Sequence, residues 1–184
     1  MTETNVHEIF KVNKDKLNVV CPPKQVFLKS DFDFLLTIGG SLVGNAKEFE
    51  NFKFLLKSIG ETEFYVLENI GATVTEREIP FKATISLESE YDEFQKIVSS
   101  FDAPFGWSIN HFFVYGCLDN WGIYICEYPT VNIIGCEKVL SDKFRKVFSI
   151  DGNGYIELEE FLNKEFQDRP DLKKQFLNEY KLQR

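Results

Sequence analysis

The chain has 184 residues, of which 43% are hydrophobic and 15% aromatic, and its formal net charge at neutral pH is −8. This length supports one hydrophobic core, so we expect a single domain over residues 1–184. A negative surface repels phosphate backbones and anionic lipids, which argues against nucleic-acid and membrane partners. No apolar run approaches the roughly 20 residues that span a bilayer, and we expect a soluble, cytoplasmic protein.

The first half of the chain predicts helices and strands in mixed order. Residues 1–20 are polar and mixed in charge. The stretch SDFDFLLTIGG, residues 30–40, is interpreted as a short helix that ends at a glycine. A longer helix is predicted from about residue 46 to 59, where apolar residues recur at three- and four-residue spacing. The short apolar and alternating runs between residues 61 and 87 are typical of strands.

The second half predicts one more helix, a group of strands and a helical end. Aromatic and aliphatic residues from Tyr91 to Phe101 form a helical stripe. From Trp107 to Gly135, three β-rich stretches are separated by GCLDN and EYPT, which is the spacing of an antiparallel meander. Residues 137–184 are predicted to be helical, and Pro170 is placed to open a final helix. The fold class is therefore α+β, with a mostly antiparallel sheet, flanking helices and a helical C-terminal segment.

The cysteines and histidines give little support to a metal or catalytic centre. The four cysteines lack a C-x-x-C pair, and most lie in apolar stretches, so free core thiols are favoured over zinc ligation or disulfides. They are Cys21, Cys117, Cys126 and Cys136. His111 is expected to be a hydrogen-bonded strand residue rather than a catalytic base. The chain also lacks a P-loop and a G-x-S-x-G elbow, so neither an enzyme nor a bound cofactor is predicted.

One stretch carries a specific signal for metal. The sequence KFRKVFSIDGNGYIELEEFL resembles an EF-hand, in which oxygen ligands at fixed positions of a 12-residue loop surround calcium and a glycine at the sixth position makes the turn. Gly154 matches that glycine, and apolar residues flank the loop at helical spacing on both sides. The resemblance implies a candidate metal site in the loop 149–160, formed by Ser149, Asp151, Asn153, Tyr155 through its carbonyl, Glu157 and Glu160.

The candidate loop departs from the EF-hand pattern at its first position. Ser149 stands where the family has Asp, so a neutral hydroxyl replaces a carboxylate and binding should weaken. The chain also has no second loop of this kind. The same residues would serve as a turn between two elements, because Asp, Asn and Gly tolerate positive φ and form local hydrogen bonds. A connection without tight metal binding is therefore favoured, and a weakly calcium-binding module is the alternative.

A second resemblance extends over the whole chain. The segments DFDFLLTIGGSLV and IELEEFLNKEF, with a β-rich middle containing tryptophan, resemble the bacterial toxin-immunity proteins related to yeast glucan-synthesis regulators. That resemblance implies a small α+β domain that neutralises a toxin by covering its active surface, and it transfers no functional residue. An acidic surface suits a basic partner, since complementary charge speeds association. The sequence thus predicts a non-catalytic, acidic protein-binding module and favours an immunity-type inhibitor of a basic toxin.

Overall fold

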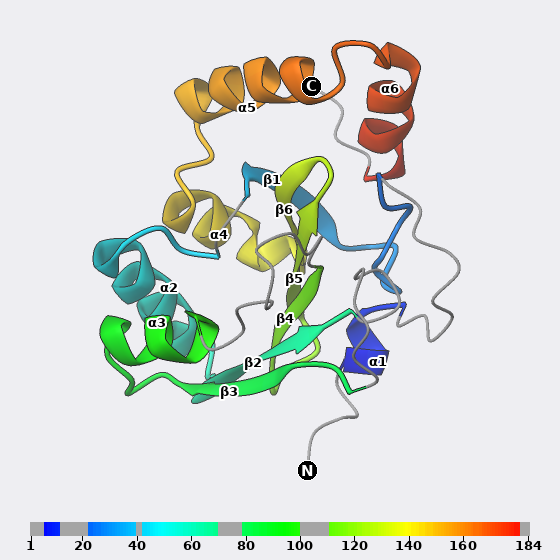
Figure 1. Ribbon diagram of the computed structural model, residues 1–184. Coiled ribbons are helices and arrows are strands. Elements are labelled where there is room, and N and C mark those ends of the chain that lie inside the picture. The colour runs from blue at the N-terminus through cyan, green and yellow to red at the C-terminus, as the bar shows by residue number, and fades with distance from the viewer. Residues whose placement is uncertain (1–5, 12–21, 40–41, 70–78, 100–110, 181–184) are drawn as a thin grey trace.

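The protein folds around one six-stranded sheet (Figure 1). The structure, a computed structural model, describes residues 6–11, 22–39, 42–69, 79–99 and 111–180. Every strand pairing among these residues is antiparallel, and the strand order is β1-β6-β5-β4-β2-β3. The strands are β1 (Asp33–Ile38), β2 (Glu63–Glu68), β3 (Lys82–Ser86), β4 (Phe112–Gly116), β5 (Trp121–Glu127) and β6 (Thr130–Cys136). The predicted α+β class is confirmed.

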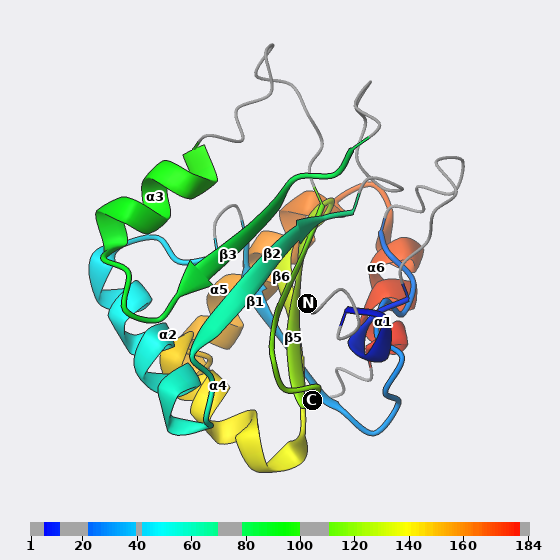
Figure 2. The same ribbon diagram turned by 90° about the horizontal axis from the view of Figure 1, so that it is seen from below.

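Three helices cover one face of the sheet (Figure 2). They are α2 (Ala46–Ser58), α3 (Tyr91–Ser99) and α4 (Ser141–Val147), the last preceded by the 3₁₀ turn η1 (Lys138–Leu140). The predicted helix over 46–59 is confirmed. Its apolar stripe places Phe52 between the rings of Phe64, Trp121 and Phe148, at centroid distances of 5.4, 6.0 and 5.8 Å. Aromatic packing of this kind contributes energy beyond the area buried, so α2 is anchored firmly to the sheet.

The opposite face is covered by elements from both ends of the chain. They are α1 (Val6–Ile9), α6 (Pro170–Glu179) and α5 (Gly152–Glu165), which lies across the β1 end of the sheet (Figure 1). Pro170 opens α6 as predicted. No helix in the described part of the chain is both long and apolar enough to cross a bilayer.

Two glycines let the N-terminal segment lie directly on this second face. Gly122 and Gly135 are paired across β5 and β6. A Cβ atom on Gly135 would lie 2.7 Å from the ring of Phe27, and one on Gly122 would lie 2.6 Å from the ring of Phe10. The two rings sit against each other, with centroids 4.9 Å apart. The glycine pair therefore forms a flat area of backbone that receives both rings.

The helix predicted over residues 30–40 is wrong, because residues 33–38 form β1. Phe34 and Leu36 belong to the apolar cluster on the α5 side, whereas Leu35 belongs to the cluster beneath α2. A strand buried on both faces has a continuous apolar run instead of alternation. A short continuous apolar run fits the spacing of a helix as well as that of a strand, which accounts for the error.

Two further expectations need correction. The predicted polar N-terminal segment contains the buried apolar residues Val6, Ile9 and Phe10, while positions 1–5 and 12–20 lie outside the described residues. Cys126 and Cys136 are buried free thiols as predicted, but Cys117 is exposed, because it follows β4 at the turn into β5. Cys21 and the start of the predicted meander, residues 107–110, also lie outside the described part.

Candidate functional site

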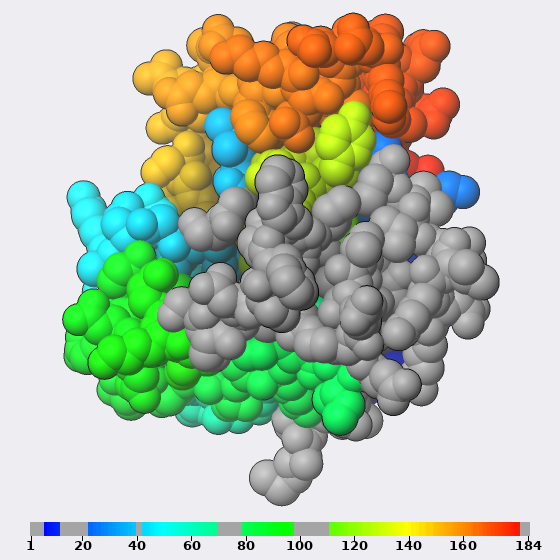
Figure 3. All heavy atoms as spheres, viewed as in Figure 1, coloured from blue at the N-terminus to red at the C-terminus, as the bar shows by residue number. Residues whose placement is uncertain are grey.

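A cavity of about 350 Å³ opens between the beginning of α2, the end of β1 and the α4–α5 connection. We call it the α2–α5 groove. Eight of its sixteen lining residues are apolar and three are glycines, and the remainder are Thr37, Glu48, Asn132, Ser149 and Glu157. In Figure 3 the end of β1, in light blue, reaches the surface below α5. An apolar cavity with a few polar groups is the usual form of a binding site.

The base of the groove is a pair of polar residues on neighbouring strands. Thr37 of β1 and Asn132 of β6 are partners in the sheet register. Asn132 is only 2% exposed. The hydroxyl oxygen of Thr37 is buried and accepts no hydrogen bond from the described residues. A buried polar atom of this kind is costly unless a ligand or water meets it, so the base of the groove is suited to a hydrogen-bond donor.

The charged residues that line the groove are both carboxylates. Glu48 accepts hydrogen bonds from the backbone N–H of Gly44 at 2.6 Å and from the side chain of Asn45 at 2.8 Å. Asn45 in turn caps α2 by accepting from the Glu48 N–H, which completes a reciprocal capping arrangement. Glu157 is exposed on α5. Among the described lining residues there is no Lys, Arg or His, so the groove is negatively charged.

The α4–α5 connection forms the other wall. Phe148 is half-buried, with its ring against Phe52 and Phe144. Ser149 follows in the left-handed region, with φ +52°. Asp151 then caps α5, because its carboxylate accepts from the backbone N–H groups of Asn153 and Gly154, both at 3.2 Å. The connection is therefore a tight, internally bonded turn that fixes where Phe148 meets the groove.

The structure distributes the predicted metal ligands instead of gathering them. The expected 12-residue loop is only the short connection before α5, which already begins at Gly152. Asn153, Glu157 and Glu160 share one side of this helix, but the first and last are separated by about 10 Å along its axis. The carbonyl of Tyr155, the atom predicted to bind metal, lies within the hydrogen-bonded backbone of α5, and the side-chain hydroxyl of Tyr155 receives a hydrogen bond from Arg145. Ser149 and Glu157 line the groove, and Asp151 acts as a cap.

Calcium binding at these residues stays a prediction, and thermal melting tests it. Calcium ligands must lie within about 2.3–2.6 Å of the ion, so binding would require the first turns of α5 to unwind. We therefore expect equal melting temperatures in millimolar calcium and in chelator. If calcium raises the melting temperature and Glu160→Gln abolishes that rise, the expectation is contradicted and calcium binding by residues 149–160 is supported. No group of three or more metal-ligating side chains occurs among the residues described.

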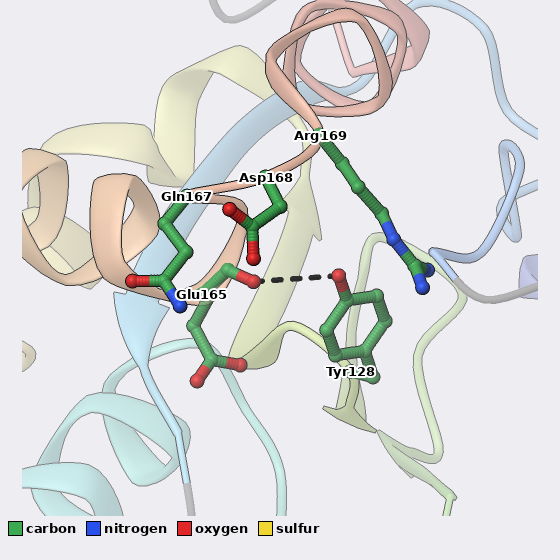
Figure 4. Close-up of a pocket in the computed structure, with 5 residues that line it drawn as sticks. All are labelled: Tyr128, Glu165, Gln167, Asp168 and Arg169. Atoms are coloured by element: carbon green, nitrogen blue, oxygen red, sulfur yellow. Dashed lines mark hydrogen bonds between the residues drawn. The ribbon is translucent and has the colours of Figure 1, made fainter.

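A second cavity lies beside the β5–β6 turn (Figure 4). It is lined by Tyr128, Glu165, Gln167, Asp168 and Arg169. The hydroxyl of Tyr128 donates to the backbone oxygen of Glu165 at 3.3 Å, and the Glu165 carboxylate accepts from the N–H of Thr130 at 3.2 Å. These bonds attach α5 to the turn. Because the lining carries charges of both signs, this cavity lacks the uniform field of the α2–α5 groove.

Glu61, the most deeply buried acidic residue after Glu68 among the described residues, has a structural role. It is 3% exposed. Its carboxylate accepts hydrogen bonds from the N–H groups of Cys117 and Leu118, at 2.8 and 3.0 Å, and from the indole N–H of Trp121 at 2.9 Å. These donors all come from the β4–β5 turn and the start of β5. Glu61 therefore fixes the turn onto the end of α2 rather than facing a cavity.

His111 is hydrogen-bonded, as predicted, but it lies directly before β4 rather than within a strand. It is 1% exposed, and its Nδ1 lies 3.1 Å from the hydroxyl of Tyr124, which also accepts from the side chain of Asn69. Burial lowers the pKa of His111 to about 4, so the folded protein holds this ring neutral near pH 7. The histidine acts as part of a buried polar network beside β2 and β4.

The lowered pKa of His111 predicts a pH-dependent stability. The unfolded chain takes up a proton at the ordinary pKa of about 6.5, whereas the folded chain resists it until about 4. The contribution of the neutral His111 to the free energy of unfolding is therefore fully present above about pH 6.5 and is lost as the pH falls toward 4. About 2 kcal/mol of it is lost by pH 5. Urea unfolding at pH 7 and 5 measures the loss. In His111→Gln the difference should shrink by that amount; an unchanged difference would contradict the assignment.

Comparisons with protein-family models, with curated proteins and with solved structures found no match to this chain. The function must therefore be argued from the groove itself. Sequence reasoning did not find Thr37, Asn132 or Glu48 as site residues. The spacing Asn45-x-x-Glu48 is a visible capping signal, and Asn132 is a polar residue inside an apolar strand, so two of the three left a trace in the sequence.

Proposed function

We propose that the chain is a non-catalytic, acidic module that binds a basic protein and neutralises it, as immunity-type inhibitors neutralise toxins. The observation that carries this proposal is the lining of the α2–α5 groove: an apolar wall, two carboxylates and no cation among the described lining residues. A net charge of −8 over the whole chain adds a long-range field of the same sign. Such a field raises the association rate with a basic partner and disfavours acidic ones.

The groove and its surroundings suit a protein partner better than a small substrate. The groove is near the lower limit, about 300 Å³, of pockets that enclose small ligands. Exposed apolar side chains lie on the elements around it, namely Ile38 at 43%, Tyr155 at 46% and Ile156 at 60% exposed. In protein interfaces a few central anchoring residues are surrounded by contacts that exclude water, and these apolar side chains would supply such contacts around the groove.

Capture followed by neutralisation tests the proposal. The immobilised chain is exposed to cell extract at about 0.1 M salt and washed at about 1 M, where the Debye length falls from about 10 to about 3 Å. A released protein is then purified and expressed with and without the chain. We expect a partner of pI above about 9 whose toxicity the chain suppresses. Capture of acidic proteins alone, or toxicity unchanged by the chain, would contradict the proposal.

A charge reversal at the groove should weaken the purified partner's binding. Glu157→Lys places a cation in the groove, and we expect an affinity loss of at least about tenfold by calorimetry. Asp171→Lys is the matched control, because it makes the same change of net charge at the exposed start of α6, outside the groove lining. The control should stay within about threefold of the original affinity, since only the screened long-range field changes. Equal losses in both variants would place the interface elsewhere.

A further inference from the structure

The chemistry of the α2–α5 groove specifies the group that it receives. All its side-chain polar atoms are oxygens, apart from the amide nitrogen of Asn132. At the base these oxygens are the hydroxyl of Thr37 and the amide oxygen of Asn132. Nearer the surface they are the carboxylates of Glu48 and Glu157 and the hydroxyl of Ser149. A matching ligand carries positive charge and several hydrogen-bond donors.

The walls require that the same ligand have an apolar stem. Val43 and Leu42 line the groove from the α2 side, and Val147, Phe148 and Leu158 line it from the α4–α5 side. A hydrated metal ion does not match such walls. Lysine and arginine both do, since each buries an aliphatic stem while its charged end seeks polar partners.

Arginine fits the groove better than lysine. Its guanidinium has five N–H donors in a plane and is more weakly hydrated than an ammonium group, so it loses less when it leaves water. The acceptors here are spread over two strands and two helices, which suits a wide planar donor. The half-buried ring of Phe148 adds an aromatic surface, and guanidinium groups stack on such rings.

We infer that the α2–α5 groove is an arginine pocket, in which one arginine side chain of the basic partner inserts between α2 and the α4–α5 connection. Its stem lies along the apolar walls. Its guanidinium donates to the oxygens of Thr37 and Asn132, and the carboxylates of Glu48 and Glu157 balance its charge. This inference rests on the proposed function, because the arginine belongs to the partner. The inference specifies which side chain of the partner the groove recognises.

Titration with a small probe tests the pocket without the partner. N-acetyl-arginine amide is added to the ¹⁵N-labelled full chain, and amide resonances are followed by NMR. We expect saturable shifts at groove residues such as Gly44 and Ser149, with a dissociation constant on the order of 1 mM. N-acetyl-citrulline amide has the same shape without the charge and should cause no saturable shift. N-acetyl-lysine amide should bind at least about fivefold more weakly.

Two variants locate the binding in the groove. Thr37→Val keeps the side-chain shape and removes the hydroxyl, and Glu157→Gln removes a charge from an exposed position with little effect on folding. Each should weaken the arginine probe by about fivefold or more. Retained affinity in either folded variant overturns the inference, as do equal effects of arginine and citrulline, equal affinity for lysine, or shifts confined to other surfaces. A partner that binds in a salt-sensitive manner while the arginine probe fails would overturn the pocket and leave the acidic module standing.

Discussion

Replacing Glu61 with alanine is expected to destabilise the protein by about 4 kcal/mol. The carboxylate is the acceptor for three donors, two on the β4–β5 turn and the third the indole N–H of Trp121. Hydrogen bonds to charged acceptors contribute about 1.5–3 kcal/mol each, and a buried donor left without a partner adds its own cost. Water can reach the turn after truncation, but Trp121 is fully buried, so the indole N–H accounts for much of the loss. Urea unfolding at neutral pH measures it.

Glu61→Gln separates the hydrogen bonds from the size of the side chain. The amide keeps one acceptor oxygen, but its NH₂ group replaces the other oxygen and faces N–H donors that need an acceptor. We therefore expect an intermediate loss of about 2 kcal/mol. The indole N–H resonance of Trp121 should move in both variants. If Glu61→Ala unfolds within about 1 kcal/mol of the original chain, the carboxylate does not hold the turn as described.

Replacing Gly135 with valine should cost about 3 kcal/mol, although valine favours strands more than glycine does. The new side chain would enter the space of the Phe27 ring, which is 1% exposed and packed against Phe10, Phe34 and Phe32. A ring held on several sides cannot turn away without moving its neighbours. Because the strand propensity of valine would raise stability, a measured loss of stability can be assigned to the clash between the valine side chain and the Phe27 ring.

A double-mutant cycle checks the origin of that loss. Phe27→Leu removes part of the ring volume that the valine meets, so Gly135→Val with Phe27→Leu should lose at least about 1 kcal/mol less than the sum of the two single changes. Additive losses would show that the two positions do not compete for space.

A helix is easiest to predict from sequence when its two sides differ in polarity. The helix over 46–59 has its apolar residues, apart from the exposed Phe54, on one side and Lys47, Glu50 and Lys57 on the other, so its helical period is clear. Residues 33–38 gave the wrong element because tertiary structure buries them on both faces, and no local pattern records that.

The groove could not be predicted from local pattern, because it depends on register. Thr37 and Asn132 are far apart in the sequence and meet only when β1 pairs with β6. The segment from Ser149 to Glu160 was ambiguous for a different reason. An aspartate followed by Asn and Gly can bind an ion or can cap a helix, and Asp151 caps α5 here. A single sequence does not distinguish these outcomes, since both use the same carboxylate oxygens.

The attachment of Tyr180 has a consequence for synthesis on the ribosome. Its hydroxyl donates to the backbone oxygen of Lys24 at 2.8 Å, and its ring lies 5.8 Å from that of Phe34, so the apolar layer near the start of the chain is completed by a residue 156 positions later. At about 5–20 residues per second, translation leaves this layer open for roughly 8–30 s. Nascent chains that stop before α6 display uncovered aromatic rings, which makes them targets for chaperones and prone to aggregate.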